Sequence, residues 1–349
     1  MTVHHYCTYF DSNYLTRGLA LYRSLARHAG EFRLHVLALD ETTRGLLTAM
    51  RLPRVRVIPL ADLERHDPDL AAVKNSRSRI EYYFTCTPSL SLHVMEHAAD
   101  AEIVTYLDAD LFLFADPEPV YRELDDQAIL IVPHRFPPDL RHFEAAGIYN
   151  VGWLSFRKGT EGRTCLRWWR DRCLEWCYDR VEPGRFADQK YLDDWPARFP
   201  GTVVLQHRGA GLAPWNVGNY TLTESAGRVW VDDQPLILYH FHGLRWVKPW
   251  LVQSRLSEYR VSPDPILKWR VYAPYLRRLL RIERDLMARS GWPGPERASG
   301  GERNPLVLAR PGVGDGPVTR LRATAQYWRA LFHAVRTDQV WIILGDRLI

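Results

Sequence analysis

Alternation between β-rich runs and helical segments over the first 135 residues is the feature that most restricts how this chain can fold. Between the first two runs, apolar residues recur at helical spacing from Leu15 to Ala29. Such alternation predicts a mostly parallel sheet, helices on both of its faces and a ligand site at the carboxyl ends of the strands. The expected fold class is therefore α/β. We expect strands over residues 3–10, 32–39, 55–60, 102–107 and 128–132.

Proline positions set the limits of two further predicted helices. Pro88 should break or kink a helix over residues 79–99, and Pro196 should stop a short helix over residues 188–195. Periodicity and turn residues indicate the other elements. These are a strand over 149–156, helices over 162–178 and 263–289, and a hairpin between 228–231 and 236–241.

Composition divides the chain into four expected parts. A catalytic domain over residues 1–262 is followed by a helical extension over 263–290 and a linker rich in Gly and Pro over 291–317. A basic amphipathic tail over 318–349 ends the chain. Apolar residues predicted on one face of a helix in this tail are Leu321, Trp328, Leu331 and Val335.

Overall composition is that of a globular protein, with 46% hydrophobic and 25% charged residues. This balance excludes a mainly disordered or coiled-coil chain. There is no apolar run long enough to span a membrane, and the first residues lack the pattern of a signal peptide. We therefore expect a cytoplasmic protein.

The cysteine and charge patterns favour neither a cysteine metal site nor nucleic-acid binding. The five cysteines include no Cys-x-x-Cys pair. Cys173 and Cys177, four residues apart on a predicted helix, could form half of a metal site, but packed apolar residues are the favoured interpretation. The net charge is +5, with the excess of arginine in the C-terminal third. Without zinc-finger spacing or a basic aromatic module, nucleic-acid binding is not expected.

Two carboxylates, Asp108 and Asp110, follow the predicted strand over residues 102–107. In extended backbone, residues two apart point to the same side, so both side chains can reach one ion. Hard oxygen ligands favour Mn²⁺ or Mg²⁺, and such an ion is useful when a diphosphate is the leaving group. Two acidic residues at a strand end can also simply cap the next turn, but the preceding apolar strand favours the functional interpretation.

A second cluster of polar residues lies near residue 240. His240 or His242 can complete a metal site, Gly243 permits close approach of a phosphate, and Arg245 or Lys248 can bind its oxygens. Taken alone, such a cluster is more often structural. Its combination with the Asp-x-Asp pair favours a metal and diphosphate site.

Together these motifs resemble family 8-type glycosyltransferases of the GT-A fold, the group of glycogenin and bacterial lipopolysaccharide hexosyltransferases. The residues Tyr106-Leu-Asp108-Ala-Asp110 are similar to the family's metal-binding motif. The stretch from His240 to Trp250 resembles its His-x-x-Gly-x-x-Lys-Pro-Trp motif, with two additional residues before Lys248. The resemblance implies a GT-A catalytic domain and a metal ion, Mn²⁺ or Mg²⁺, bound by Asp108, Asp110 and His240. His240 is preferred over His242 because Gly243 follows it at the family spacing.

The resemblance also extends to the expected donor and acceptor sites, over roughly residues 3–250. Asp188 and Gln189 resemble the family's Asp-Gln motif, which faces the donor sugar, and they are the expected catalytic residues. Asn150 and Gly152 lie where the family has Asn-Ser-Gly, although Val replaces Ser here. Donor contacts are expected from Thr8, Asp11, Tyr14, Arg79, Asp108, Asn150, Gly152, Gly243, Arg245 and Lys248. Acceptor contacts are expected from Trp215, Asn216 and Asn219, unless their loop is an ordinary turn.

The predicted function is transfer of a hexosyl unit from a nucleotide diphosphate sugar, with retention at the anomeric carbon implied by the resemblance. The acceptor is expected to be a saccharide or a lipid-linked molecule. A phosphohydrolase of the HAD type is the alternative enzyme, but Phe112 stands where its motif normally has Thr or Val. A nucleotide-sugar-binding subunit without catalysis is the alternative outside the enzymes.

The basic tail has two interpretations. It can dock on an anionic membrane, at the inner face, and bring the enzyme to a lipid-linked acceptor. Alternatively, its apolar face packs against the catalytic domain or against a second subunit as a homodimer. Packing is the favoured interpretation.

Overall fold

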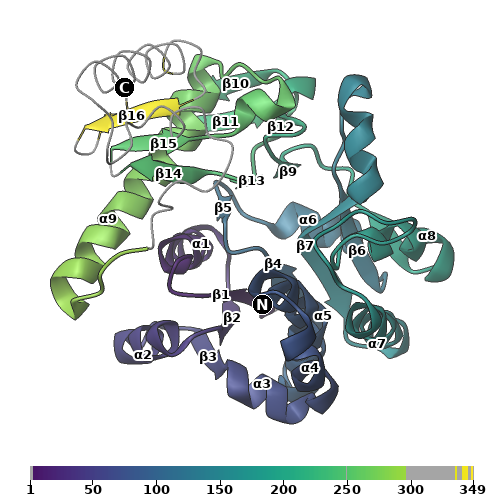
Figure 1. Ribbon diagram of the computed structural model, residues 1–349. Coiled ribbons are helices and arrows are strands. Elements are labelled where there is room, and N and C mark those ends of the chain that lie inside the picture. Colours follow the sequence, from purple (N-terminus) through teal and green to yellow (C-terminus); the bar gives the residue numbers. More distant parts are fainter. Residues whose placement is uncertain (1–2, 249, 296–334, 336–339, 345–346, 349) are drawn as a thin grey trace, which may run out of the picture.

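The large sheet and its flanking helices confirm the predicted α/β class (Figure 1). The computed structural model describes residues 3–248, 250–295, 335, 340–344 and 347–348. The strand order is β3-β2-β1-β4-β7-β6-β8, and β7 alone runs antiparallel to its neighbours. The strands are β1 His4–Phe10, β2 Phe32–Ala38, β3 Val55–Pro59, β4 Ile103–Leu107, β6 Ile129–Pro133, β7 Tyr149–Arg157 and β8 Thr202–Val204.

The helices agree with the predicted periodicity, but the expected break at Pro88 and stop at Pro196 are wrong. Pro88 lies inside a continuous helix, and buried side chains on both sides of it pack the two adjacent turns against the core. Pro196 occupies the first turn of a short α-helix, where a missing N–H costs nothing. The α-helices are α1 Leu15–His28, α2 Glu41–Met50, α3 Leu60–His66, α4 Pro68–Val73, α5 Arg79–His97, α6 Glu118–Leu124, α7 Thr160–Glu175, α8 Trp195–Arg198 and α9 Ala273–Ser290.

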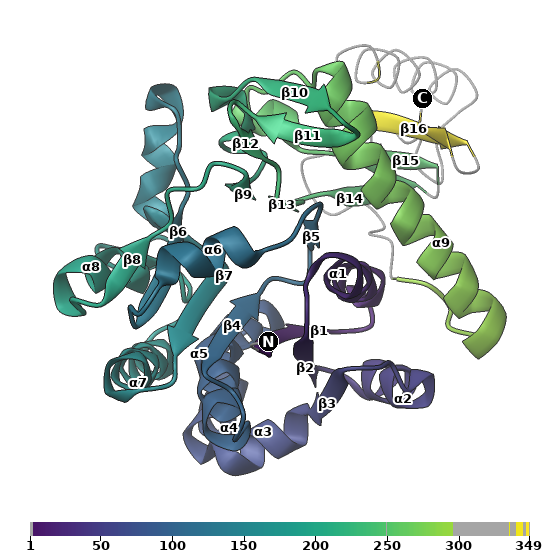
Figure 2. The same cartoon turned by 180° about the vertical axis from the view of Figure 1, so that it is seen from behind.

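Hydrophobic clusters cover both faces of the large sheet. Alternate side chains of each strand enter different clusters, as Tyr6 and Cys7 of β1 do. Helices α5 and α7 lie on one face, whereas α1 and α9 lie on the other (Figure 2). All five cysteines are buried and unbridged, and Cys173 and Cys177 lie in the apolar cluster under α5 and α7, in agreement with the packing interpretation.

A small sheet beside the large one has the order β5-β13-β9, with β5 Leu111–Leu113, β13 Leu238–His240 and β9 Ala210–Leu212. The predicted hairpin between 228–231 and 236–241 is therefore wrong. Strand β11 (Arg228–Val231) pairs instead with β10 (Leu222–Ser225) and with the short β12 (Gln234–Pro235). The apolar run after β12 is buried, so it joins β5 in the core and not an exposed hairpin.

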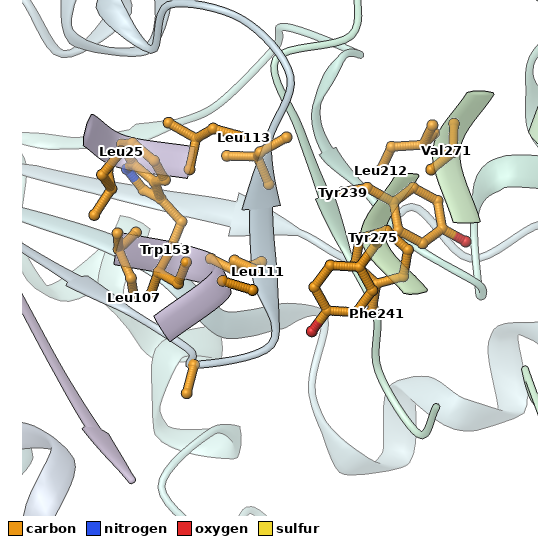
Figure 3. Packing of buried hydrophobic residues seen from close by; sticks show 14 of the residues in the cluster. Leu25, Leu107, Leu111, Leu113, Trp153, Leu212, Tyr239, Phe241, Val271 and Tyr275 are labelled. Atoms are coloured by element: carbon orange, nitrogen blue, oxygen red, sulfur yellow. The ribbon is translucent and has the colours of Figure 1, made fainter. Parts of the chain in front are cut away.

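Aromatic packing fixes the small sheet against the C-terminal helices. Phe241, next to β13, stacks on Tyr275 of α9 with ring centroids 3.8 Å apart. The Tyr239 hydroxyl lies 3.0 Å from that of Tyr272. Figure 3 shows this aromatic group on one side of β5 and the apolar residues Leu25, Leu107 and Trp153 on its other side. Strand β5 is thus packed between two parts of the core.

A third sheet contains segments that are distant in sequence. Strands β14 (Arg245–Lys248) and β15 (Leu251–Gln253) pair with each other, and β15 pairs with β16 (Val340–Leu344), which pairs with β17 (Arg347–Leu348). The strand β16 was not predicted. Its Trp341 is buried against Tyr272, so this end of the chain packs on the body of the protein. Most of the predicted linker, and Leu321, Trp328 and Leu331 of the predicted tail helix, lie outside the described residues.

No described helix combines the length and the hydropathy that spanning a membrane would require.

We predict opposite stability effects from two Gly→Ala substitutions. In Gly209→Ala the new methyl would lie 2.0 Å from the Pro235 carbonyl oxygen, so backbone must move and unfolding free energy should fall by about 1–3 kcal/mol. In the control Gly45→Ala, on exposed α2, nothing lies within 4 Å and stability should rise by about 0.5–1 kcal/mol. Urea unfolding of both variants measures these changes. An equal change of unfolding free energy in the two variants would contradict the close packing between β9 and β12.

Candidate functional site

The Asp-x-Asp pair occupies the turn that links β4 to β5. Asp108 donates its backbone N–H to the Gly152 carbonyl, 3.0 Å away, and its carbonyl accepts from the Leu111 N–H at 3.2 Å. The Tyr106 hydroxyl donates to the Asp108 carboxylate at 2.9 Å. These bonds hold both carboxylates at the carboxyl end of β4, where an α/β sheet places its ligands.

Pairing of β13 with β5 brings His240 to this turn. His240 lies opposite Leu111 in the ladder, and the Phe241 N–H donates to the Asp110 carbonyl at 3.0 Å. The His240 Nε2 atom is 3.1 Å from Asp110 Oδ1 and 3.6 Å from Asp108 Oδ2. One ligand atom from each of the three residues lies within 4.8 Å of the others. We call Asp108, Asp110 and His240 the metal triad.

Charge and burial at the metal triad suit a divalent cation. Burial raises the pKa of Asp108, and His240 opposes this. At Asp110 the same burial is outweighed by His240, which brings the pKa of Asp110 down to about 2. Burial lowers the pKa of His240, but Asp110 more than compensates and raises it. Two carboxylates and one imidazole are a donor set suited to Mn²⁺ or Mg²⁺.

Strand β7 forms one wall of the metal triad. A Cβ added at Gly152 would lie 2.9 Å from both His240 Nδ1 and Asn150 Oδ1, so only glycine fits there. The Nδ1 atom of His240 is buried without a hydrogen-bond partner among the described residues. Asn150 donates to the Val132 carbonyl at 3.2 Å and accepts from the Gly152 N–H at 3.0 Å. Asn150 therefore holds the backbone that lines His240.

Asp188 and Gln189 lie in a turn on the other side of the Asp-x-Asp pair. Burial, followed by the charge of Asp108, raises the pKa of Asp188 to about 7, against a hydrogen bond from Thr87. Trp169 Nε1 donates to the Asp188 carbonyl at 2.7 Å and fixes the turn. The Gln189 side chain donates to the Ala146 carbonyl at 3.0 Å. The structure therefore brings Asp188 within electrostatic reach of the metal triad.

The residues expected at the N-terminal part of the donor site lie between β1 and α1. Thr8 is fully buried with an unpartnered hydroxyl, and Asp11 accepts from the Asn13 and Tyr14 N–H groups. Burial raises the pKa of Asp11, and the charge of Arg79 is among the groups that oppose this, which places Arg79 near that carboxylate. Tyr14 is 42% exposed and lies under the Arg17 guanidinium.

The expected diphosphate residues do not meet the metal triad. Arg245 donates to the Gln253 side chain at 2.9 Å, and Lys248 lies on β14, with no contact to the triad among the described residues. Gly243 has a φ of 71°, and a Cβ there would lie 2.5 Å from the Arg255 side chain. The left-handed backbone and the close Arg255 side chain both favour glycine at this position, and the expected approach of a phosphate to Gly243 stays a prediction.

Two arginines near the site were missed by sequence reasoning. Arg17 is buried, donates to the Leu244 carbonyl at 2.6 Å and helps to lower the pKa of Asp110. Arg255 lies against Gly243 and helps to lower the pKa of His242. Arg17 had no local signal, because it lies off the apolar face that Leu15, Leu19 and Leu25 predict for this helix. Arg255 had none either, in a chain with many arginines.

A row of aromatic rings runs from the metal triad to the surface. Trp215 packs on His240 and His242, with ring centroids 5.2 and 5.4 Å away, and next to Tyr259 at 6.3 Å. Tyr259 contacts Phe143, which is 36% exposed. We call Trp215, Tyr259 and Phe143 the aromatic row. Trp215 Nε1 is buried without a hydrogen-bond partner in the described part of the chain.

The other two expected acceptor residues have structural contacts. Asn216 accepts from the Ala213 N–H and donates to the His134 and Gly211 carbonyls. Asn219 donates to the Arg135 carbonyl at 2.7 Å. These bonds fold the loop that presents Trp215, whose Nε1 is the one buried side-chain nitrogen of the three without a hydrogen-bond partner among the described residues.

We predict that His240 and His242 differ in metal binding. Replacing a ligand should weaken Mn²⁺ binding by more than about tenfold in His240→Ala, whereas His242→Ala should retain it, since His242 is outside the metal triad. Titration followed by electron paramagnetic resonance of free Mn²⁺ measures both variants. Equal loss in the two variants would contradict the triad.

Comparison with known proteins finds two relatives in Bacillus subtilis (strain 168). YfnD is 31% identical over 285 residues, which cover 80% of this chain and 90% of YfnD. YfnF is 33% identical over 250 residues, which cover 69% of this chain and 82% of YfnF. Both are described as uncharacterized proteins. No protein-family model matches the chain.

Three similar solved structures are described as glycosyltransferases of different kinds. The galactosyltransferase LgtC, in complex with donor and acceptor sugar analogs, is 19% identical with a TM-score of 0.49, and the match covers 76% of this chain and 99% of LgtC. Mouse xyloside xylosyltransferase 1 is 15% identical with a TM-score of 0.45, and the match covers 69% of this chain and 98% of that protein. GlyE of Streptococcus pneumoniae TIGR4 is 15% identical with a TM-score of 0.46, and the match covers 83% of this chain and 64% of GlyE.

Proposed function

The chain belongs to the family of YfnD and YfnF, and we propose that it is a metal-dependent glycosyltransferase that moves a hexosyl unit from a nucleotide diphosphate sugar to a saccharide. The observation that carries this proposal is the metal triad at the carboxyl end of β4. Beside it lie a His240 nitrogen without a hydrogen-bond partner among the described residues and the buried Asp188, whose pKa is raised. Tyr14, Asp11 and Arg79 lie at the end of the adjacent strand β1, where a nucleotide can bind.

A divalent ion held by the metal triad would neutralise charge on the departing diphosphate, an effect of several kcal/mol. The chain's own residues prepare that position. Gly152 leaves room for His240, and Tyr106 orients the Asp108 carboxylate through its hydroxyl. Arg17 adds a fixed positive charge near Asp110. Because these groups are buried and held by hydrogen bonds, they need little rearrangement when a donor binds.

Asp188 has the properties needed to position the donor sugar. Its carboxyl is buried near Asp108, and Trp169 holds its backbone. A carboxyl in this position can accept hydrogen bonds from sugar hydroxyls, and in its ionised form it stabilises positive charge at the anomeric carbon as the glycosidic bond breaks. The Gln189 side chain donates to the Ala146 carbonyl and so links the turn of Asp188 to the segment before β7. In the proposed complex, Gln189 lies in the same turn as Asp188 and faces the sugar from there.

The aromatic row supports a saccharide acceptor. Trp215 lies against His240, Tyr259 lies next to Trp215, and Phe143 extends the row to solvent. Flat aromatic faces bind the apolar faces of pyranose rings, and the unpaired Trp215 Nε1 can donate to a hydroxyl. We therefore place the acceptor along this row and the donor on the side of α1.

We predict that Asp110→Asn abolishes donor turnover. Loss of one oxygen ligand should lower nucleotide release from a UDP- or GDP-sugar in Mn²⁺ by about 1,000-fold, since several kcal/mol of charge stabilisation are lost. The thermal unfolding midpoint, measured in parallel without metal, should remain within a few degrees of the wild-type value. Full activity of this variant would contradict the proposal. Phosphate release without sugar transfer by the wild type would favour a phosphohydrolase.

We also predict an acceptor defect from Phe143→Ala. Because the ring is partly exposed, its removal should leave folding intact and raise the KM for the acceptor about three- to tenfold, with the KM for the donor unchanged. The matched control is Met287→Ala, which removes an exposed apolar side chain from α9. An unchanged acceptor KM in Phe143→Ala would place the acceptor elsewhere.

A further inference from the structure

A cavity of about 350 Å³ lies away from the metal triad, between α1, the segment after β5, the β10–β11 hairpin and the start of α9. Figure 2 shows these four elements gathered behind β5. We call this cavity the arginine groove, because five arginines line it against one carboxylate, that of Glu224. The arginines are Arg23, Arg27, Arg228, Arg270 and Arg278.

The arginine groove is separate from the proposed catalytic site. Arg17 lies near Asp110, and Arg27 is ten residues further along the same helix, which corresponds to a distance of about 15 Å. Strand β5 likewise runs from the metal triad at Leu111 toward Phe114, which lines the groove. No member of the metal triad or of the aromatic row lines the cavity.

Most of the positive charge in the arginine groove is unpaired. Arg270 forms an ion pair with Glu224 at 2.8 Å, and Arg23 lies 3.7 Å from Asp285. For Arg27, Arg228 and Arg278, no ion pair or hydrogen bond of the side chain is found within the described ranges. Three guanidinium groups thus line one cavity without a carboxylate partner in the part of the chain that the structure describes.

Mutual repulsion among these arginines is visible at Arg278. Burial, followed by the charges of Arg23, Arg281 and Arg27, lowers the pKa of the Arg278 guanidinium. Repulsion between like charges lowers the free energy of unfolding, so this cluster of arginines does not stabilise the fold. A bound anion would relieve the repulsion.

The other walls of the arginine groove are mostly apolar, with Ser24 and His28 as the polar members. Phe112 and Phe114 lie edge to face, with ring centroids 5.2 Å apart, and Pro235, Pro274 and Val229 are among the other lining residues. A concave site with apolar walls and a few charged groups is typical of small-molecule sites and not of flat membrane contacts. Guanidinium groups bind phosphates and carboxylates through paired N–H donors.

From this geometry we propose that the arginine groove binds a small organic anion carrying two or more phosphate or carboxylate groups. Arg27, Arg228 and Arg278 contact its charged groups, and the phenylalanines contact its apolar part. This site is additional to the donor site, and its existence does not depend on the transferase activity.

Calorimetric titration of the full chain with inorganic tripolyphosphate and, separately, with citrate tests this proposal and distinguishes the two anion classes. The protein is first passed over a chelating resin, so that no metal ion bridges the probe to the metal triad. We expect binding of at least one probe, weakened at least tenfold in Arg27→Gln/Arg278→Gln. We also expect several-fold weakening between 50 and 200 mM salt. The control Arg51→Gln/Arg163→Gln removes two arginines outside the cavity and should bind like the wild type.

Two further measurements examine whether the metal triad takes part in binding and whether the groove variant is folded. Asp110→Asn should bind the probe with unchanged affinity, because the metal triad is not involved. The melting temperature of Arg27→Gln/Arg278→Gln should not fall, since the substitutions reduce repulsion. If that variant is poorly folded, Arg228→Gln at the exposed hairpin replaces it with the same expected loss. Absence of binding to both probes, or equal affinity in the groove and control variants, would overturn the proposal.

Discussion

The antiparallel pairing of β13 with β5 is the interaction on which the proposed site depends. It joins His240 to a turn about 130 residues earlier in the chain. Without this ladder, Asp108 and Asp110 would lose the imidazole counter-charge of His240, and the repulsion between the two carboxylates would be costly. With it, one imidazole lies within 3.6 Å of both carboxylates. The register matters as much as the pairing, because a shift of one residue would turn His240 to the opposite face of the small sheet.

The rest of the C-terminal region serves to hold this ladder. Tyr275 of α9 stacks beside β13, and Tyr272 bonds the Tyr239 hydroxyl and packs on Trp341 of β16. The same α9 also faces α1, whose first turn carries Arg17 near Asp110 and whose last turns line the arginine groove. One helix pair therefore connects the proposed catalytic site, the core and a second charged cavity.

The fold class and the residues of the metal triad could be predicted from sequence, because strand periodicity and a polar motif after an apolar strand are local signals. The donor contacts of Arg245 and Lys248 stay predictions, and the pairing of β14 with β15, which brings Arg245 to Gln253, had no local signal. Pro88 does not break its helix and the 236–241 segment joins β5, because tertiary packing outweighs local preference. Arg17, Arg255 and the arginine groove depend on contacts between distant segments, which composition does not show.

The most direct test of the central claim is calorimetric titration of the wild-type chain with a panel of UDP- and GDP-sugars, with and without Mn²⁺. The account predicts tight binding of one donor that requires the metal, because the metal triad would link the protein to the diphosphate through the ion. Equally tight binding without metal would contradict the role of Asp108, Asp110 and His240. Failure of every donor to bind with Mn²⁺ present would contradict the assignment as a nucleotide-sugar glycosyltransferase.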